Sequence, residues 1–141
     1  MTIYRWMGAA AMAAALAGCT EEPAEMPGPQ DGAALYRQTC ADCHGADARG
    51  GGPLAQEMEI SPKDLTRISE RNGGAFPRAR IMSIIDGYAR SDMTGPGMPE
   101  FGALLEGDLV PFDSGDGIQT PTPRKLVALL EYLESVQAPE G

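Results

Sequence analysis

The sequence brings two thiols and an imidazole together in the pentapeptide CADCH at residues 40–44. His44 is the sole histidine among the 141 residues, and the one cysteine besides Cys40 and Cys43 is Cys19. In a C-x-x-C-H pattern the two thiols can add to the vinyl groups of haem, and the adjacent imidazole can bind the iron as its fifth ligand. The pentapeptide therefore predicts one covalently bound haem c.

Three other chemistries fit the two cysteines less well. A thioredoxin-like redox pair would accompany a βαβ pattern, which is not seen in this sequence. A tetrahedral zinc site needs a fourth ligand, and the sequence has no second histidine, while Cys19 is remote. A disulfide between Cys40 and Cys43 would close a small, strained ring and constrain little of the chain.

A sixth iron ligand has to come from another residue type, and methionine thioether is a soft ligand suited to haem iron. The methionines beyond residue 18 are Met26, Met58, Met82, Met93 and Met98. Met82 sits in a helical pattern, where core packing is its expected role. Met93 and Met98 lie in the Gly- and Pro-rich stretch MTGPGMPEFG, where turns could aim a side chain. Because Pro99 restricts the backbone before it, Met98 is favoured over Met93.

The elements that must position these residues are predicted to be helical, so the expected fold class is all-α. Asp31 can cap a helix through Thr39, and Asp64 can cap a short helix through Glu70. A third helix is expected between Pro77 and Gly87. The glycine-rich segment 45–53 is expected to be a loop and 95–119 to be irregular, without convincing strands.

The strongest helical pattern lies near the C-terminus. Thr122 is expected as its N-cap and Pro123 as its first-turn residue. Leucines then recur at three- and four-residue spacing, at positions 126, 129, 130 and 133.

Residues 32–137 resemble a class I cytochrome c domain, a small all-helical haem c fold. The resemblance rests on the CADCHG attachment sequence, the Met98-Pro99 loop and the terminal helices. It implies that Cys40 and Cys43 form the thioether bonds, that His44 is the proximal iron ligand and that Met98 is the distal one. It also implies that the Pro53 carbonyl accepts a hydrogen bond from the proximal imidazole, which would fix its tautomer.

The same resemblance assigns packing roles on the first and last helices. Gly32 and Tyr36 match the small and aromatic positions of the first helix, and Leu129 and Tyr132 match their partners on the last. The aromatic residues expected to line the haem crevice or the core are Phe76, Tyr88, Phe101 and Phe112. Arg78 or Arg80 could pair with a haem propionate or lie on a solvated helix face.

With both axial positions filled by protein, electron transfer is the remaining function of the iron. We expect an electron carrier, not an enzyme, that passes single electrons from one exported or membrane redox protein to another. One alternative is an electron-entry subunit of a larger membrane oxidoreductase complex. Another is a haem enzyme or sensor whose distal site is open.

The N-terminal residues have the order of an export signal. In residues 1–18, Arg5 precedes an uncharged Ala- and Met-rich run, and Leu16–Cys19 resembles the lipobox of bacterial lipoproteins. This predicts cleavage before Cys19 and lipid attachment to Cys19, which would anchor the exported protein to a membrane on its periplasmic side. A plain secretory signal with a soluble periplasmic product, or an uncleaved anchor, remains the alternative. Residues 19–30 are predicted to be an acidic, Pro-rich tether and 31–138 the cytochrome c domain.

The formal net charge of -9 and the pI near 4.5 argue against nucleic acid as a partner, because phosphates would repel this chain. An acidic surface favours a redox partner with a basic patch. The acidic segment 113–117 lacks the spacing of an EF-hand and is predicted to be a turn.

Overall fold

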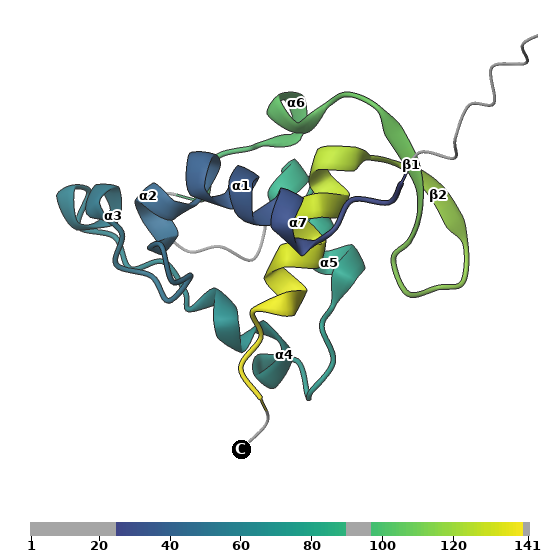
Figure 1. Ribbon diagram of the computed structural model, residues 1–141. Coiled ribbons are helices and arrows are strands. Elements are labelled where there is room, and N and C mark those ends of the chain that lie inside the picture. The colour runs from purple at the N-terminus through teal and green to yellow at the C-terminus, as the bar shows by residue number, and fades with distance from the viewer. Residues whose placement is uncertain (1–24, 90–96, 140–141) are drawn as a thin grey trace, which may run out of the picture.

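The computed structural model describes residues 25–89 and 97–139, which form a largely helical domain with a small two-stranded sheet (Figure 1). The predicted signal and lipid-attachment residues, 1–18 and Cys19, lie outside the described residues. In chain order the elements are α1 (Pro29–Thr39), α2 (Ala41–His44), α3 (Pro53–Glu57), the 3₁₀ helix η1 (Leu65–Arg67), α4 (Ile68–Arg71), α5 (Arg78–Asp86), α6 (Gly102–Leu105), β1 (Leu109–Asp113), β2 (Gln119–Pro123) and α7 (Arg124–Ser135).

The first and last helices, α1 and α7, cross in close contact (Figure 1). A β-carbon on Gly32 would overlap the carbonyl oxygen of Ala128, so only glycine permits this approach. Beside the crossing, the rings of Tyr36 and Tyr132 lie with their centroids 5.0 Å apart and their planes tilted by 46°. The predicted crossing of the terminal helices is therefore confirmed.

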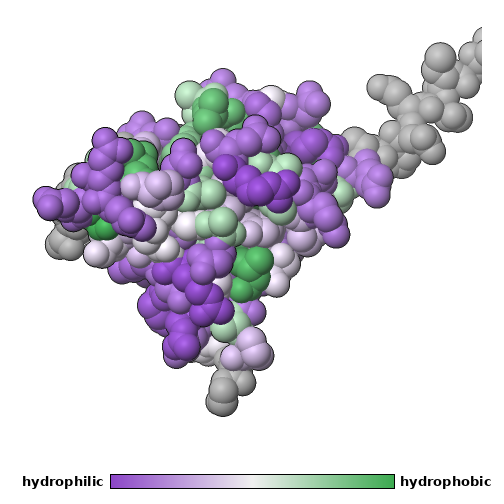
Figure 2. Space-filling model, turned by 60° about the vertical axis from the view of Figure 1, so that its left-hand side comes forward, coloured by the Kyte–Doolittle hydropathy of each residue, from purple (hydrophilic) through white to green (hydrophobic). Residues whose placement is uncertain are grey.

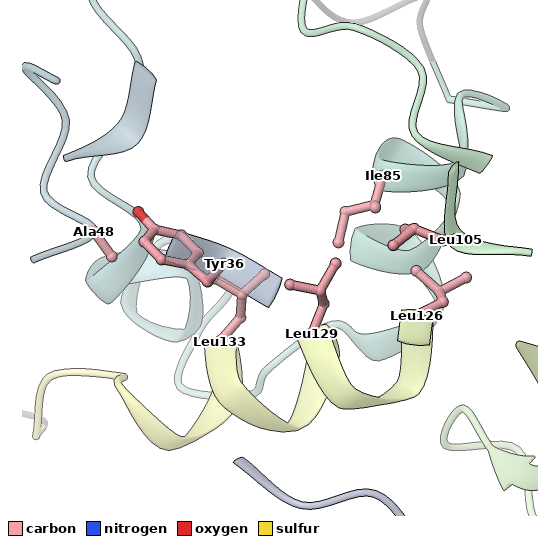
Figure 3. Close-up of a cluster of buried hydrophobic side chains, with 7 residues drawn as sticks. All are labelled: Tyr36, Ala48, Ile85, Leu105, Leu126, Leu129 and Leu133. Atoms are coloured by element: carbon pink, nitrogen blue, oxygen red, sulfur yellow. The ribbon is translucent and has the colours of Figure 1, made fainter. Parts of the chain in front are cut away.

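The main core forms where α7 meets α1, α5 and α6 (Figure 3). Its buried members are Tyr36, Ala48, Ile85, Leu105, Leu126, Leu129 and Leu133. Three of them are the leucines that the helical spacing of α7 places on one face. Burying each such side chain stabilises the fold by about 1.5–3 kcal/mol. We call this set the central cluster.

The prediction that residues 95–119 are irregular and that the fold lacks strands is wrong for the segment before α7. Strands β1 and β2 form an antiparallel hairpin in which Val110 pairs with Thr122 and Phe112 with Thr120. Val110 and Phe112 point inward and form a second buried cluster with Val127 and Leu130 of α7. Leu109 and Pro111 alternate with them and face outward. Because these outward residues are apolar, the strand lacks the alternation of apolar and polar residues that would reveal it in the sequence.

The turn of this hairpin is the acidic segment 113–117, as predicted. The carboxylate of Asp113 accepts hydrogen bonds from the backbone N–H groups of Gly115, Asp116 and Gly117. These bonds hold the pKa of Asp113 below its usual value. The Asp113 carboxylate therefore organises the turn.

Two helices begin elsewhere than predicted. Helix α1 begins at Pro29, so the last two residues of the predicted 19–30 tether are helical, and Asp31 lies in the first turn, where its carboxylate accepts the Gly28 N–H at 2.9 Å. Helix α7 begins at Arg124 because Thr122 and Pro123 pair with β1. Pro29 is the first residue of α1, and Pro123 directly precedes α7. For α7, the pairing of Pro123 with Leu109 in the hairpin determines where the helix begins.

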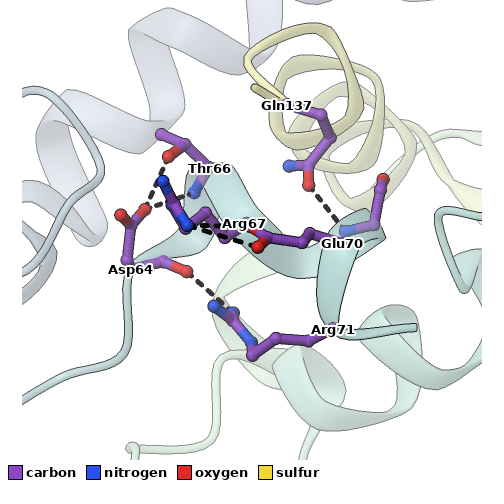
Figure 4. Close-up of polar contacts among 7 residues, drawn as sticks. Asp64, Thr66, Arg67, Glu70, Arg71 and Gln137 are labelled. Atoms are coloured by element: carbon purple, nitrogen blue, oxygen red, sulfur yellow. Dashed lines mark hydrogen bonds and ion pairs between the residues drawn. The ribbon is translucent and has the colours of Figure 1, made fainter. Parts of the chain in front are cut away.

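The C-terminal end of α7 fastens the segment around η1 and α4 (Figure 4). The side chain of Gln137 accepts the Ser69 N–H and donates to the Leu65 carbonyl. Asp64 caps η1, as predicted for a helix start, by accepting the N–H and the hydroxyl of Thr66. This segment is thereby fixed against the end of the last helix.

The face in Figure 2 is mostly hydrophilic, with small separate apolar patches. Among the residues that the structure describes, no helix combines the length and hydrophobicity needed to cross a bilayer.

Candidate haem-attachment site

The CADCH pentapeptide consists of Cys40, the one residue between α1 and α2, and the four residues of α2. Cys40 ends α1, where its N–H donates to the Tyr36 carbonyl, and its own carbonyl accepts the N–H groups of Cys43 and His44 at 3.2 and 2.9 Å. One helical turn thus separates the two cysteines, which places their side chains on one face. Both cysteines are free thiols and half-buried, and burial raises the pKa of Cys40.

His44 is half-buried, and the Nδ1 atom of its imidazole is buried. Burial lowers the pKa of His44, and the backbone of Lys63, acting as a hydrogen-bond acceptor near the ring, opposes this shift. The geometry does not complete a hydrogen bond to Nδ1, which is buried and has no partner. A buried donor of this kind requires an acceptor, so the approach of the Lys63 backbone matters for the orientation of the ring.

The chain after His44 folds back along the pentapeptide and meets the segment that contains Lys63. Gly50 donates its N–H to the His44 carbonyl at 2.7 Å, and a β-carbon on Gly50 would lie 2.6 Å from the Pro62 carbonyl oxygen. Leu65 also donates its N–H to the Ala48 carbonyl at 2.7 Å. Residues 62–65 therefore run beside residues 48–50, close to the imidazole.

The role of Pro53 as the hydrogen-bond acceptor for the His44 imidazole stays a prediction. Pro53 is exposed and begins helix α3. Among the described residues no hydrogen bond joins its carbonyl to Nδ1 of His44, and the backbone group that raises the pKa of the imidazole belongs to Lys63. Reasoning from the sequence missed Lys63, although the S-P-K-D-L-T stretch contains the Asp64 helix cap that holds the segment in place.

Met98 is far from the pentapeptide in the chain but packs against the same central cluster as Cys40. Its segment is anchored to α5, because Phe101 donates its N–H to the Ile85 carbonyl at 3.0 Å. Met82 packs against both buried clusters, as predicted for a core residue. Met58 and Met26 are about half exposed, at 52% and 46%, and Met93 lies outside the described residues.

Residues 27–109 match the family model described as cytochrome c oxidase, cbb3-type, subunit III. The match covers more than half of the 141 residues. The chain belongs to this family. It is a c-type cytochrome whose domain implies electron transfer on covalently bound haem c. Neither the curated proteins nor the solved structures contain a match to the chain.

The residues of this c-type cytochrome fit a haem. The two free thiols lie one helical turn apart, and the imidazole of His44 directly follows the second of them. Apolar side chains from separate segments pack around the central cluster while remaining partly exposed; they include Leu35, Leu65, Phe76, Ile81, Met98 and Phe101. Thiols, imidazole and apolar walls are the groups that covalent haem requires.

Two predictions about the surroundings of the cytochrome site need correction. Tyr88 is 88% exposed, so it does not lie in the core. Phe112 is buried in the second cluster on the hairpin side of α7, as predicted for a core residue. Arg78 forms ion pairs with Glu131 and Glu134 and lies over the ring of Phe112. It is therefore committed to α7 and the hairpin instead of being available for a propionate.

Proposed function

We propose that this cytochrome carries one haem, bonded to the thiols of Cys40 and Cys43, with His44 and Met98 as its axial ligands, and that it passes single electrons between redox partners. The observation that carries the assignment is that Cys40 and Met98, distant in sequence, pack against one cluster of buried side chains. The haem supplies the redox change, and a histidine–methionine pair raises its reduction potential.

The family description supports a second candidate, an electron-entry subunit of a larger membrane oxidoreductase complex. The matched model is named for an oxidase subunit. In that case the cytochrome exchanges electrons with neighbouring subunits instead of diffusing between partners. Extraction in a gentle detergent distinguishes the two: a free carrier purifies alone, and a subunit purifies with the haem oxidase that accepts its electrons.

We also propose that residues 1–18 are removed during export and that a lipid on Cys19 anchors the domain on the periplasmic side of a membrane. The support is the sequence Leu16–Cys19 and the presence of a third cysteine outside the pentapeptide. The net charge of -9 favours a redox partner with a basic patch and disfavours nucleic acid.

Intact-mass measurement after expression with a haem-attachment apparatus tests both proposals together. The wild-type protein should carry the mass of one haem and of acyl chains. Cys19→Ser should keep the haem and appear in the soluble fraction. The double variant Cys40→Ser/Cys43→Ser should carry no covalent haem. A colourless wild-type protein contradicts the haem assignment, and a Cys19→Ser protein that stays with the membranes contradicts the lipid anchor.

An open distal site is the third possibility, and carbon monoxide tests it. With Met98 bound to iron, the ferrous protein should bind carbon monoxide slowly and incompletely at neutral pH. Rapid, stoichiometric binding would instead favour a haem enzyme or sensor.

A further inference from the structure

Tyr36 forms hydrogen bonds with the first residue of the CADCH pentapeptide and with the residue that directly follows it. Its backbone carbonyl accepts the N–H of Cys40 at 2.9 Å, and its hydroxyl donates to the carbonyl of Gly45 at 2.8 Å. Gly45 directly follows His44 and is itself buried. One side chain on α1 is thus bonded to the residue next to the predicted iron ligand.

The hydroxyl of Tyr36 is held rigidly and remains a donor. The residue is fully buried, and its ring packs against Tyr132 at the crossing of α1 and α7. Burial raises the pKa of Tyr36 far above its usual value, so the hydroxyl keeps its proton at every physiological pH. Pure packing would be served as well by phenylalanine, because a buried hydroxyl costs free energy unless it is hydrogen-bonded.

We propose that the Tyr36 hydroxyl is a positioning group for His44: by holding the Gly45 carbonyl, it fixes the backbone on which the imidazole is mounted. This inference rests on the proposed function, in which His44 binds the iron. The peptide between Gly45 and Ala46 cannot rotate freely while its carbonyl accepts the Tyr36 hydroxyl, and this holds the residue that directly follows His44. The backbone that carries the imidazole is consequently held in one conformation, which limits the orientations in which the ring can bind the haem iron.

The fold should survive loss of this bond, which makes the proposal testable. The Gly45 carbonyl also accepts the N–H of Ala48 at 3.2 Å, so it keeps one partner in Tyr36→Phe. The matched control is Tyr132→Phe, which removes a hydroxyl from the other ring of the same pair. Among the described contacts, the Tyr132 hydroxyl makes no hydrogen bond to the pentapeptide.

The experiment compares the two haem-loaded variants with wild type by amide hydrogen exchange, by NMR of the axial imidazole and by reduction potential. In Tyr36→Phe the amides of His44, Gly45 and Ala48 should exchange about fivefold faster, the factor that corresponds to one net hydrogen bond. The imidazole resonances and the potential should shift as well. Tyr132→Phe should leave the imidazole resonances and the potential at wild-type values.

Two results would overturn the proposal. One is a Tyr36→Phe protein whose imidazole resonances and potential equal those of wild type. The other is equal shifts in both variants, which would mean that the ring pair acts only through packing. Failure of the proposed function is a separate outcome, because it appears in the wild-type protein as absence of covalent haem.

Discussion

Gly32 of α1 lies so close to Tyr132 of α7 that a β-carbon on the glycine would stand 2.6 Å from the β-carbon of the tyrosine. The same added carbon would overlap the carbonyl oxygen of Ala128, which is backbone and cannot rotate away. Gly32→Ala must therefore separate the two helices, and we expect it to lower the free energy of unfolding by about 3 kcal/mol. Chemical denaturation measures this loss.

Gly28→Ala is the control for this prediction, because its added carbon would meet only the Gln30 side chain, at 3.5 Å. It should change the free energy of unfolding by less than about 1 kcal/mol. Equal losses in the two variants would mean that the crossing tolerates an extra carbon.

The crossing shows which parts of the fold the sequence could reveal. The leucine spacing of α7 is a local pattern whose period matches a helix, so it was predicted correctly. The packing roles of Gly32 and Tyr36 were predicted from the resemblance to class I cytochrome c domains. The hairpin was missed because its outward positions carry Leu109 and Pro111, which erase the alternation that marks a half-buried strand. The buried side of β1 exists only because α7 supplies Val127 and Leu130 to cover it.

Gly50 tests whether the segment containing Lys63 orients the imidazole of His44. A β-carbon on Gly50 would lie 2.6 Å from the Pro62 carbonyl oxygen, so Gly50→Ala should push this segment away from the ring. Nδ1 would then lose the influence of the Lys63 backbone, and the potential and the imidazole NMR resonances should change.

Gly51→Ala is the matched control for Gly50→Ala. Both glycines have positive φ, 91° and 72°, but a β-carbon on Gly51 would meet nothing within 4 Å. Both variants should lose about 1 kcal/mol of stability to backbone strain. The imidazole resonances should move only in Gly50→Ala, and Pro53→Ala should leave them unchanged. A shift in Pro53→Ala with none in Gly50→Ala would instead return the acceptor role to Pro53.

Arg78 connects three elements, and its loss should affect stability instead of redox properties. It pairs with Glu131 and Glu134 on α7 and lies 5.4 Å from the centre of the Phe112 ring. These side chains are about a third exposed, so we expect Arg78→Ala to cost only about 1–2 kcal/mol. The reduction potential should stay at the wild-type value, whereas a marked change would place this guanidinium beside a propionate after all.

Arg67→Ala provides the comparison for Arg78→Ala. Arg67 pairs with Glu70 across one helical turn, and both side chains are more than half exposed. Its removal should cost less than about 0.5 kcal/mol. Denaturation of both variants at low and at high salt separates the two contributions.

Asp64 should make stability depend on acid pH. Its hydrogen bonds with Thr66 lower its pKa below the usual 3.8, so the folded state binds this proton less tightly than the unfolded state. The contribution is complete above pH 3.8 and is lost as the pH falls through the folded-state value. In Asp64→Asn this part of the acid destabilisation should disappear, which denaturation between pH 6 and pH 2 measures. Identical pH profiles for wild type and variant would contradict the prediction.

In the candidate site, as in the fold, local motifs could be predicted from the sequence, whereas contacts between distant segments could not. The pentapeptide is a local motif, so Cys40, Cys43 and His44 could be named from spacing alone, and Pro99 singled out Met98 among the methionines. The acceptor near His44 and the hydroxyl that holds Gly45 were not predicted, because both depend on where distant segments fold back. A backbone carbonyl carries no residue signature, so only the path of residues 62–65 reveals Lys63.

Met98 is the residue whose replacement tests the axial ligand directly. In Met98→Ala the haem should stay attached through its two thioether bonds, the reduction potential should fall, and the ferrous protein should bind carbon monoxide rapidly, because the thioether no longer occupies the iron. Met58→Ala is the control, since Met58 is 52% exposed at the end of α3 and should leave spectrum and potential unchanged. A wild-type spectrum and potential in Met98→Ala, together with altered ones in Met93→Ala, would transfer the ligand role to Met93.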